Sequence, residues 1–303
     1  MSKHITTPGI LSSTEPPQAE RSYTSSAQAS AGQGILQAQQ LCLAYEDRTV
    51  INNMDISLPE GKVSVIIGPN GCGKSTLLRA LAGLLPISSG QVLLANKALS
   101  QYKAKERARL LGLLPQSSTA PTGIRVADLV ARGRFPHQGL LRQWSEHDAQ
   151  AVEAALTQTQ LLALADRPVA DLSGGQRQRV WLALVLAQEP DILLLDEPTT
   201  YLDIAHQYEV LELCKTLNRE QGKTLVMVLH DLNQAARYAD HLIAMKSGEL
   251  IASGPAQEVI QPALIEHIFG MQAIITPDPV TSTPMVVPER ICATDGTAAK
   301  ALT

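Results

Sequence analysis

The segment from Gly68 to Thr76 constrains the fold of this chain more than any other segment. It fits the pattern G-x-x-x-x-G-K-[ST] and stands between an apolar run, Val63 to Ile67, and a helical pattern of leucines. In a strand, loop and helix unit of this kind, backbone N–H groups converge on phosphate oxygens and the helix N-terminus adds favourable partial charge. The pattern therefore predicts a nucleotide site made by Gly68, Pro69, Asn70, Gly71, Cys72, Gly73, Lys74, Ser75 and Thr76.

Two side chains of this loop carry its chemistry. Lys74 would reach the β and γ phosphates, and the Ser75 hydroxyl would ligate Mg²⁺. The alternative is a glycine-rich turn that matches by accident, which happens at roughly the one per cent level in a chain of this length. The strand and helix on either side reduce that chance further.

A pair of carboxylates follows a second apolar strand, Ile192 to Leu195. Ligands bind at the carboxyl ends of strands in open parallel sheets. Asp196 would hold Mg²⁺, directly or through water, and Glu197 would act as a general base on the attacking water. Alone, the pair could simply end a buried strand, but the presence of Lys74 favours the functional interpretation.

The run LSGGQ, residues 172–176, places small residues before another helical pattern, which makes a second anion-binding helix end. Its position between the other two motifs resembles the ATP-binding cassette (ABC) ATPases, over residues 35 to about 255. That resemblance implies an α/β fold of the P-loop NTPase class, with a RecA-like core, an antiparallel β subdomain and an inserted helical subdomain at about 117–187. It also implies a head-to-tail homodimer of ATPase subunits, in which the partner's ATP is contacted by Ser173, Gly174, Gly175 and Gln176.

The same resemblance assigns roles to single residues elsewhere. Tyr45 would stack on adenine, Gln116 would sense Mg²⁺ and the γ-phosphate, Asp203 would lie in a loop that crosses the dimer interface, and His230 would hydrogen-bond the γ-phosphate. Without the family context, each is an ordinary strand or loop residue. Every hydrolytic position is filled, so the resemblance implies ATP hydrolysis with Mg²⁺, and the catalytic residues would be Lys74, Gln116, Glu197 and His230.

Composition divides the chain into three parts. Residues 1–34 are rich in Ser, Thr, Pro, Gly and Gln, so we expect a disordered N-terminal tail. Residues 35–255 contain all the motifs and form the expected ATPase domain, and residues 256–303 form a C-terminal extension. Strands alternate with helices outside the insert, which predicts a mostly parallel sheet.

Charge and hydropathy exclude several classes of function. The net charge of -4 and an aromatic content of 3% argue against nucleic acid as a partner, because such surfaces need a basic groove and stacking rings. No apolar run reaches about 18 residues, so we expect no bilayer-spanning segment and infer separate permease subunits. The start of the chain lacks a signal-peptide pattern and the four cysteines lack paired spacing, which favours the cytoplasm.

Three further strings, residues 129–137, 202–207 and 229–235, resemble the ATPase subunits of ferric-siderophore importers, closest to the ferric enterobactin type. The stretch 279–284 is similar to that subgroup as well. The resemblance implies a peripheral subunit on the cytoplasmic face of the inner membrane, with integral membrane permeases and, indirectly, a substrate-binding protein as partners. Haem, vitamin B12 and zinc or manganese importers share much of this pattern. A soluble ABC ATPase outside transport is a more distant alternative.

Three arginines in the predicted insert, Arg132, Arg134 and Arg142, allow two interpretations. They form a solvated basic face, or they line a groove that receives a cytoplasmic helix of the permease. The second interpretation predicts that Glu at 132 and 134 uncouples ATPase activity from the permease and leaves nucleotide affinity intact.

Overall fold

The computed structural model describes residues 34–45, 48–139, 144–200 and 202–292. The expected disordered tail, residues 1–34, lies outside this range apart from Gly34. Arg142 also lies outside it. Among the described residues, no helix is long and apolar enough to cross a membrane.

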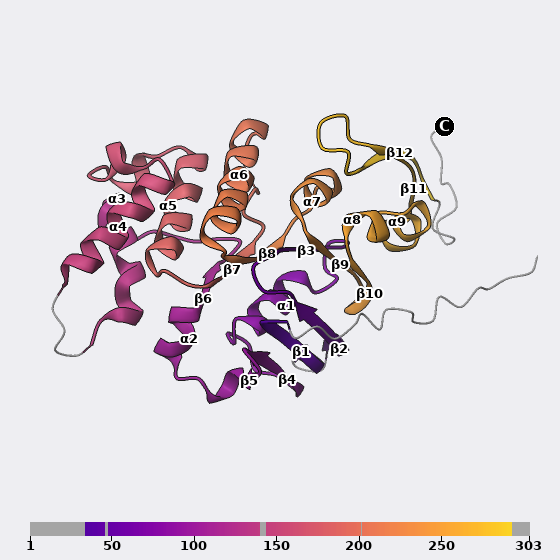
Figure 1. The fold of residues 1–303 in the computed structure, drawn as a ribbon, viewed down its shortest axis with the longest axis horizontal. Helices are drawn as coiled ribbons and strands as arrows, with labels where there is room; N and C mark the ends of the chain where they lie inside the picture. The colour runs from indigo at the N-terminus through magenta and orange to yellow at the C-terminus, as the bar shows by residue number, and fades with distance from the viewer. Residues whose placement is uncertain (1–33, 46–47, 140–143, 201, 293–303) are drawn as a thin grey trace, which may run out of the picture.

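A six-stranded sheet runs through the centre of the molecule, in the order β10-β9-β3-β8-β7-β6 (Figure 1). All neighbouring strands are parallel except β10, which pairs antiparallel with β9. The pair Ser247-Gly248 predicts a two-residue hairpin turn, and in the structure these residues join β9 to β10 with φ of 49° and 83°. The strands are β3 (Val63–Ile67), β6 (Leu111–Leu114), β7 (Ile192–Asp196), β8 (Thr224–Val228), β9 (His241–Lys246) and β10 (Glu249–Gly254).

The inner strands of this sheet are apolar at nearly every position, so both of its faces have to be covered by other elements. On β3, Val65 and Ile67 pack in one hydrophobic cluster and Ile66 packs in the other. Figure 1 shows α6 (Ile204–Gln221) and α7 (Leu232–Tyr238) on one face and α1 (Lys74–Leu81) on the opposite face. The expected α/β fold with a mostly parallel sheet is therefore confirmed.

A four-stranded antiparallel sheet, in the order β2-β1-β4-β5, packs beyond α1 (Figure 1). The sequence predicts a strand near Ile56 to Leu58, which is only the end of β2, because exposed Asn52 and Asn53 interrupt the alternation of apolar residues before it. The spacing of Leu77, Leu78, Leu81 and Leu84 predicts one helix through all four residues. Helix α1 ends at Leu81 and Leu84 is 58% exposed, so the prediction is wrong for Leu84. The strands are β1 (Leu36–Tyr45), β2 (Arg48–Leu58), β4 (Ser89–Leu94) and β5 (Lys97–Ala98).

Helices dominate between β6 and β7, where the sequence predicted a helical insert (Figure 1). Ser145, with Asp148 three residues later, predicts a helix N-cap, and the structure confirms it. The Ser145 hydroxyl accepts a hydrogen bond from the Asp148 amide, and the Asp148 carboxylate accepts one from the Ser145 amide. The short helix α2 (Ala104–Leu110) precedes β6, and Leu99–Gln101 forms a 3₁₀ turn before it. The insert contains α3 (Val126–Ala131), η2 (Arg132–His137), α4 (Glu146–Gln158), η3 (Leu162–Leu164), η4 (Val169–Asp171) and α5 (Gly174–Ala187).

The structure corrects the prediction for Arg134. Its side chain is 2% exposed, and its guanidinium contacts Asp148 Oδ1 at 2.9 Å and Glu189 Oε2 at 2.7 Å. It therefore belongs neither to a solvated face nor to the lining of an open groove. Arg132 is exposed, as both interpretations require. The reason for the error is that the partners of Arg134 lie 14 and 55 positions away along the chain.

The C-terminal residues up to 292 pack onto the ATPase core. Ile265, Ile268 and Val286 belong to the same hydrophobic cluster as α6 and α7. Strands β11 and β12 pair antiparallel as a separate hairpin. These elements are α8 (Ala256–Val259), α9 (Pro262–Phe269), β11 (Met271–Pro277) and β12 (Pro284–Ile291).

Candidate nucleotide site

The loop from Gly68 to Gly73 joins β3 to α1 and needs glycine at its two ends. A Cβ at Gly68 would collide with the carbonyl oxygen of Met245 on β9. Gly73 has φ of 103° and is the N-cap of α1, a conformation that side chains with a Cβ rarely adopt. The first N–H groups of a helix have no partner within it, so α1 presents them to this loop. The loop is thus built to hold an anion.

Lys74 lies inside this loop and is 5% exposed. Its Nζ donates hydrogen bonds to the carbonyl oxygens of Gly68, at 2.8 Å, and Pro69, at 2.9 Å. An ammonium group has three N–H donors, so one remains for an anion in the loop.

Asp196 and Ser75 meet at the carboxyl ends of β7 and β3. Ser75 Oγ donates to Asp196 Oδ1 at 2.7 Å, while Asp196 Oδ2 is buried with no partner among the described residues. Burial raises the pKa of the Asp196 carboxyl, against the effect of the Ser75 hydrogen bond. An orphaned carboxylate oxygen beside a hydroxyl fits Mg²⁺, which is usually bound through one or two carboxylates together with substrate phosphates.

Glu197 directly follows Asp196 and adopts φ of 52°, a strained backbone conformation of the kind that clusters at active sites. Gln116 Nε2 donates to its Oε2 at 2.7 Å, Thr200 Oγ1 donates to the same oxygen at 2.9 Å, and His230 Nε2 lies 2.6 Å from Oε1. Burial acts to raise the pKa of Glu197, but the hydrogen bonds from His230, Thr200 and Gln116 outweigh it and leave that pKa below its usual value. The carboxylate is therefore ionised at neutral pH.

Lys74, Ser75, Gln116, Glu197 and His230 line one cavity of about 1240 Å³, more than the 300–1,000 Å³ typical of small-molecule sites. Asp196 and Gly68 lie behind its lining. Sequence reasoning missed its remaining walls, formed by β2 and the turn between β9 and β10. Thr200 could have been found, because it stands three residues after Glu197 and bonds back to it. The lining residues are Arg48, Thr49, Val50, Pro69, Asn70, Gly71, Cys72, Gly73, Lys74, Ser75, Thr76, Gln116, Glu197, Thr200, His230, Lys246, Ser247 and Gly248.

The LSGGQ residues do not line this cavity. Ser173 caps α5 by accepting a hydrogen bond from the Gln176 amide at 3.2 Å, and both Ser173 and Gly174 are exposed. Asp203 caps α6 in the same way, through the His206 amide at 2.9 Å. Within one chain, the two predicted anion sites are therefore separate.

Tyr45 ends β1 and pairs with Arg48, which lines the cavity. Its side chain lies outside what the structure describes, so stacking on adenine stays a prediction.

The chain is similar to known proteins over most of its length. Residues 51–200 match the family described as ABC transporter. The ferric enterobactin transport ATP-binding protein FepC of Escherichia coli (strain K12) is 53% identical, over 84% of this chain and 93% of FepC. The achromobactin transport ATP-binding protein CbrD of Dickeya dadantii (strain 3937) is 51% identical, over 83% of this chain and 93% of CbrD.

One solved structure, a dimeric post-hydrolysis state of the ATP-binding cassette MJ0796 bound to ADP and Pi, is 28% identical with a TM-score of 0.65. It covers 73% of this chain, which covers 98% of MJ0796. The chain belongs to the ATP-binding subunits of the ABC transporter family. The predicted fold class and family are confirmed.

Replacing Lys74 with Ala should weaken ATP binding roughly 10- to 100-fold, because the loop loses a charged hydrogen-bond donor. Fluorescence titration with an ATP analogue measures this loss. Lys97→Ala, an exposed lysine at the start of β5, is the matched control and should bind like wild type. Equal affinity of the Lys74→Ala and control variants would contradict the assignment of Lys74.

Proposed function

We propose that this chain hydrolyses ATP to power the import of a ferric siderophore across the cytoplasmic membrane, together with separate permease subunits. The observation that carries the proposal is the Glu197 carboxylate, held ionised by Gln116, Thr200 and His230 beside a phosphate-binding loop. The similarity to FepC and CbrD supports the siderophore cargo, because their names assign them to ferric enterobactin transport and achromobactin transport.

Hydrolysis follows from the groups around the cavity. Glu197 takes a proton from the attacking water, and its lowered pKa keeps it unprotonated for that step. Lys74 donates its third N–H to the γ-phosphate, where negative charge lies in the transition state. His230 donates there as well, when its N–H moves from Glu197 Oε1 to the phosphate.

Magnesium would be held by Asp196, Ser75 and Gln116, and it would neutralise charge on the phosphates. The orphaned Asp196 Oδ2 supports this assignment. Gln116 now donates to Glu197, so metal binding at Gln116 requires its side-chain oxygen, because the amide nitrogen is a donor.

The exposure of Ser173 and Gly174 in the LSGGQ run supports a head-to-tail dimer. Ser173, Gly174, Gly175 and Gln176 of one subunit would close over ATP in the cavity of the other, with Asp203 at the same interface. ATP binding then closes the pair and hydrolysis reopens it. Gln116 and the helical insert pass this motion to the permeases. A substrate-binding protein on the other side of the membrane would deliver the cargo, and nucleic acid has no part in the cycle.

Cellular uptake of radiolabelled iron tests the cargo. Iron is supplied as several ferric siderophores and as haem, to cells that lack the native gene and carry either the wild type or Glu197→Gln at equal levels. We expect uptake of one siderophore class with the wild type and background uptake with Glu197→Gln. Loss of haem uptake alone would reassign the cargo to haem. No loss for any iron source would overturn the iron assignment.

A further inference from the structure

The C-terminal hairpin β11–β12 is hydrogen-bonded to the first turn of α7. The amide of Val286 on β12 donates to Asn233 Oδ1 at 2.7 Å, and Asn233 Nδ2 donates back to the carbonyl oxygen of Val286 at 3.3 Å. The Asn233 side chain thus pairs with β12 as a neighbouring strand would. This contact ties the hairpin to the second residue of α7.

A second contact ties the loop of the hairpin to the last turn of α7. Arg237 Nη2 lies 2.6 Å from Asp278 Oδ2, and these side chains are 21% and 8% exposed. Asp278 Oδ1 also accepts hydrogen bonds from the amides of Val280 and Thr281, which fixes the loop. Hydrogen bonds from Val280, Arg237 and Thr281 hold the pKa of Asp278 at about 2, so the ion pair is intact at neutral pH.

Helix α7 in turn places His230. Asp231 caps the helix, with Oδ1 accepting from the amides of Asn233 and Gln234 at 2.8 Å each. His230 is the residue immediately before this cap, and its side chain is 44% exposed. Because solvent surrounds nearly half of that ring, its position 2.6 Å from Glu197 Oε1 depends on the backbone that enters α7.

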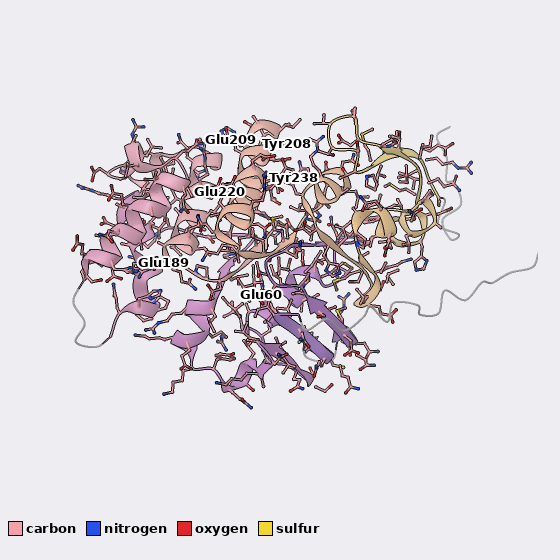
Figure 2. The ribbon with its side chains drawn as sticks, viewed as in Figure 1. Glu60, Glu189, Tyr208, Glu209, Glu220 and Tyr238 are labelled. Carbon is pink, nitrogen blue, oxygen red and sulfur yellow. The ribbon has the colours of Figure 1, made fainter. Side chains whose placement is uncertain are left out.

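The same helix contacts α6, which begins directly after Asp203. Gln234 Nε2 donates to Gln207 Oε1 at 2.7 Å, and Tyr238 OH donates to Glu212 Oε1 at 2.7 Å. Figure 2 labels Tyr208 and Tyr238 in the space between these helices, where their rings meet edge to face. A shift of α7 would therefore move the backbone at His230 and would also disturb the contacts with α6, which begins after Asp203.

We propose that the hairpin β11–β12 is a clamp on α7 that holds His230 beside Glu197, with Asn233 and Arg237 as positioning residues. The clamp rests on the proposed ATPase function and adds a role for the C-terminal extension in setting the rate of hydrolysis. The simpler alternative is that the hairpin only covers apolar surface, in which case its contacts with α7 would affect stability and not turnover.

Steady-state ATP hydrolysis by the full-length chain separates these two roles. Asn233→Ala removes both bonds to Val286 at an exposed helical position where Ala is well tolerated. We expect kcat to fall roughly tenfold, since small displacements of a catalytic group cost up to about 10²-fold. The KM for ATP should change by less than about twofold. Arg237→Met should behave similarly, and Arg237→Lys should restore most of the rate because it keeps the ion pair.

The decisive comparison repeats Asn233→Ala in a His230→Ala background. If Asn233 acts through His230, the double variant should be no slower than His230→Ala alone. Arg290→Ala is the matched control, because Arg290 bonds Gln272 within the hairpin; its kcat should equal the wild-type value. An unchanged kcat for Asn233→Ala, or the same fold loss in both backgrounds, would overturn the clamp. Absence of hydrolysis by the wild type would instead overturn the proposed function.

Discussion

Glu197→Gln should lower ATP turnover by about 10²-fold or more while ATP binding is retained, the scale expected when a general base is lost. The amide that replaces the carboxylate cannot accept a proton from water at neutral pH. It also has one acceptor oxygen where the carboxylate has two, so it cannot accept hydrogen bonds from Gln116 and Thr200 on one side and from His230 on the other. Lys74 and the phosphate loop are untouched, which is why affinity should survive.

The measurement is phosphate release by the full-length chain together with nucleotide affinity from titration. Glu60→Gln is the matched control: Glu60 is exposed and lies outside the cavity lining (labelled in Figure 2), and its turnover should equal the wild-type rate. Retention of more than about a tenth of the wild-type rate by Glu197→Gln would argue that another group serves as the base.

The Arg134→Ala variant should lose about 3–5 kcal/mol of unfolding free energy, the range found when one partner of a buried ion pair is removed. Asp148 is fully buried and would keep its charge without the guanidinium. The Ser145 hydroxyl bonds Asp148 and keeps the pKa of Asp148 low, with Arg134 adding to that effect, so neutralisation by protonation offers little relief near pH 7. Arg134 Nη1 also donates to the carbonyl oxygen of Ala187 at 2.7 Å, at the end of α5.

Denaturant unfolding of the full chain measures this loss. Arg132→Ala, two residues away and exposed, is the matched control and should stay within about 0.5 kcal/mol of wild type. A loss below about 1 kcal/mol for Arg134→Ala would mean that the buried network contributes little to holding η2 and α4 against α5.

Local signals in the sequence predicted the phosphate loop and its surroundings well. Glycines, the strand before them and the leucine pattern after them all belong to one continuous segment, so no knowledge of distant contacts is needed. The same holds for Ser145, whose cap depends only on Asp148 three residues later. The sequence also predicted that the carboxylates at 196 and 197 follow an apolar strand, and Asp196 is the last residue of the buried strand β7.

Distant contacts explain what the sequence did not predict. From the sequence alone, Arg134 is expected on the surface. In the structure it is buried, because the packing of η2 against α5 places Glu189 beside it. The hairpin β11–β12 has few alternating apolar residues and has prolines at 277, 284 and 288, so its sequence did not predict two paired strands. Its attachment through Asn233 and Val286 spans 53 positions, which no local pattern reports.

We propose that the ATP site is complete only when two copies of the chain pair head to tail. Light scattering of Glu197→Gln, with and without Mg²⁺-ATP, tests it most directly, and the Glu197→Gln, Lys74→Ala double variant is the control that should not engage the nucleotide. We expect a dimer for Glu197→Gln in the presence of Mg²⁺-ATP, and monomers both without nucleotide and for the double variant. A chain that binds ATP with unchanged affinity and stays monomeric would contradict it.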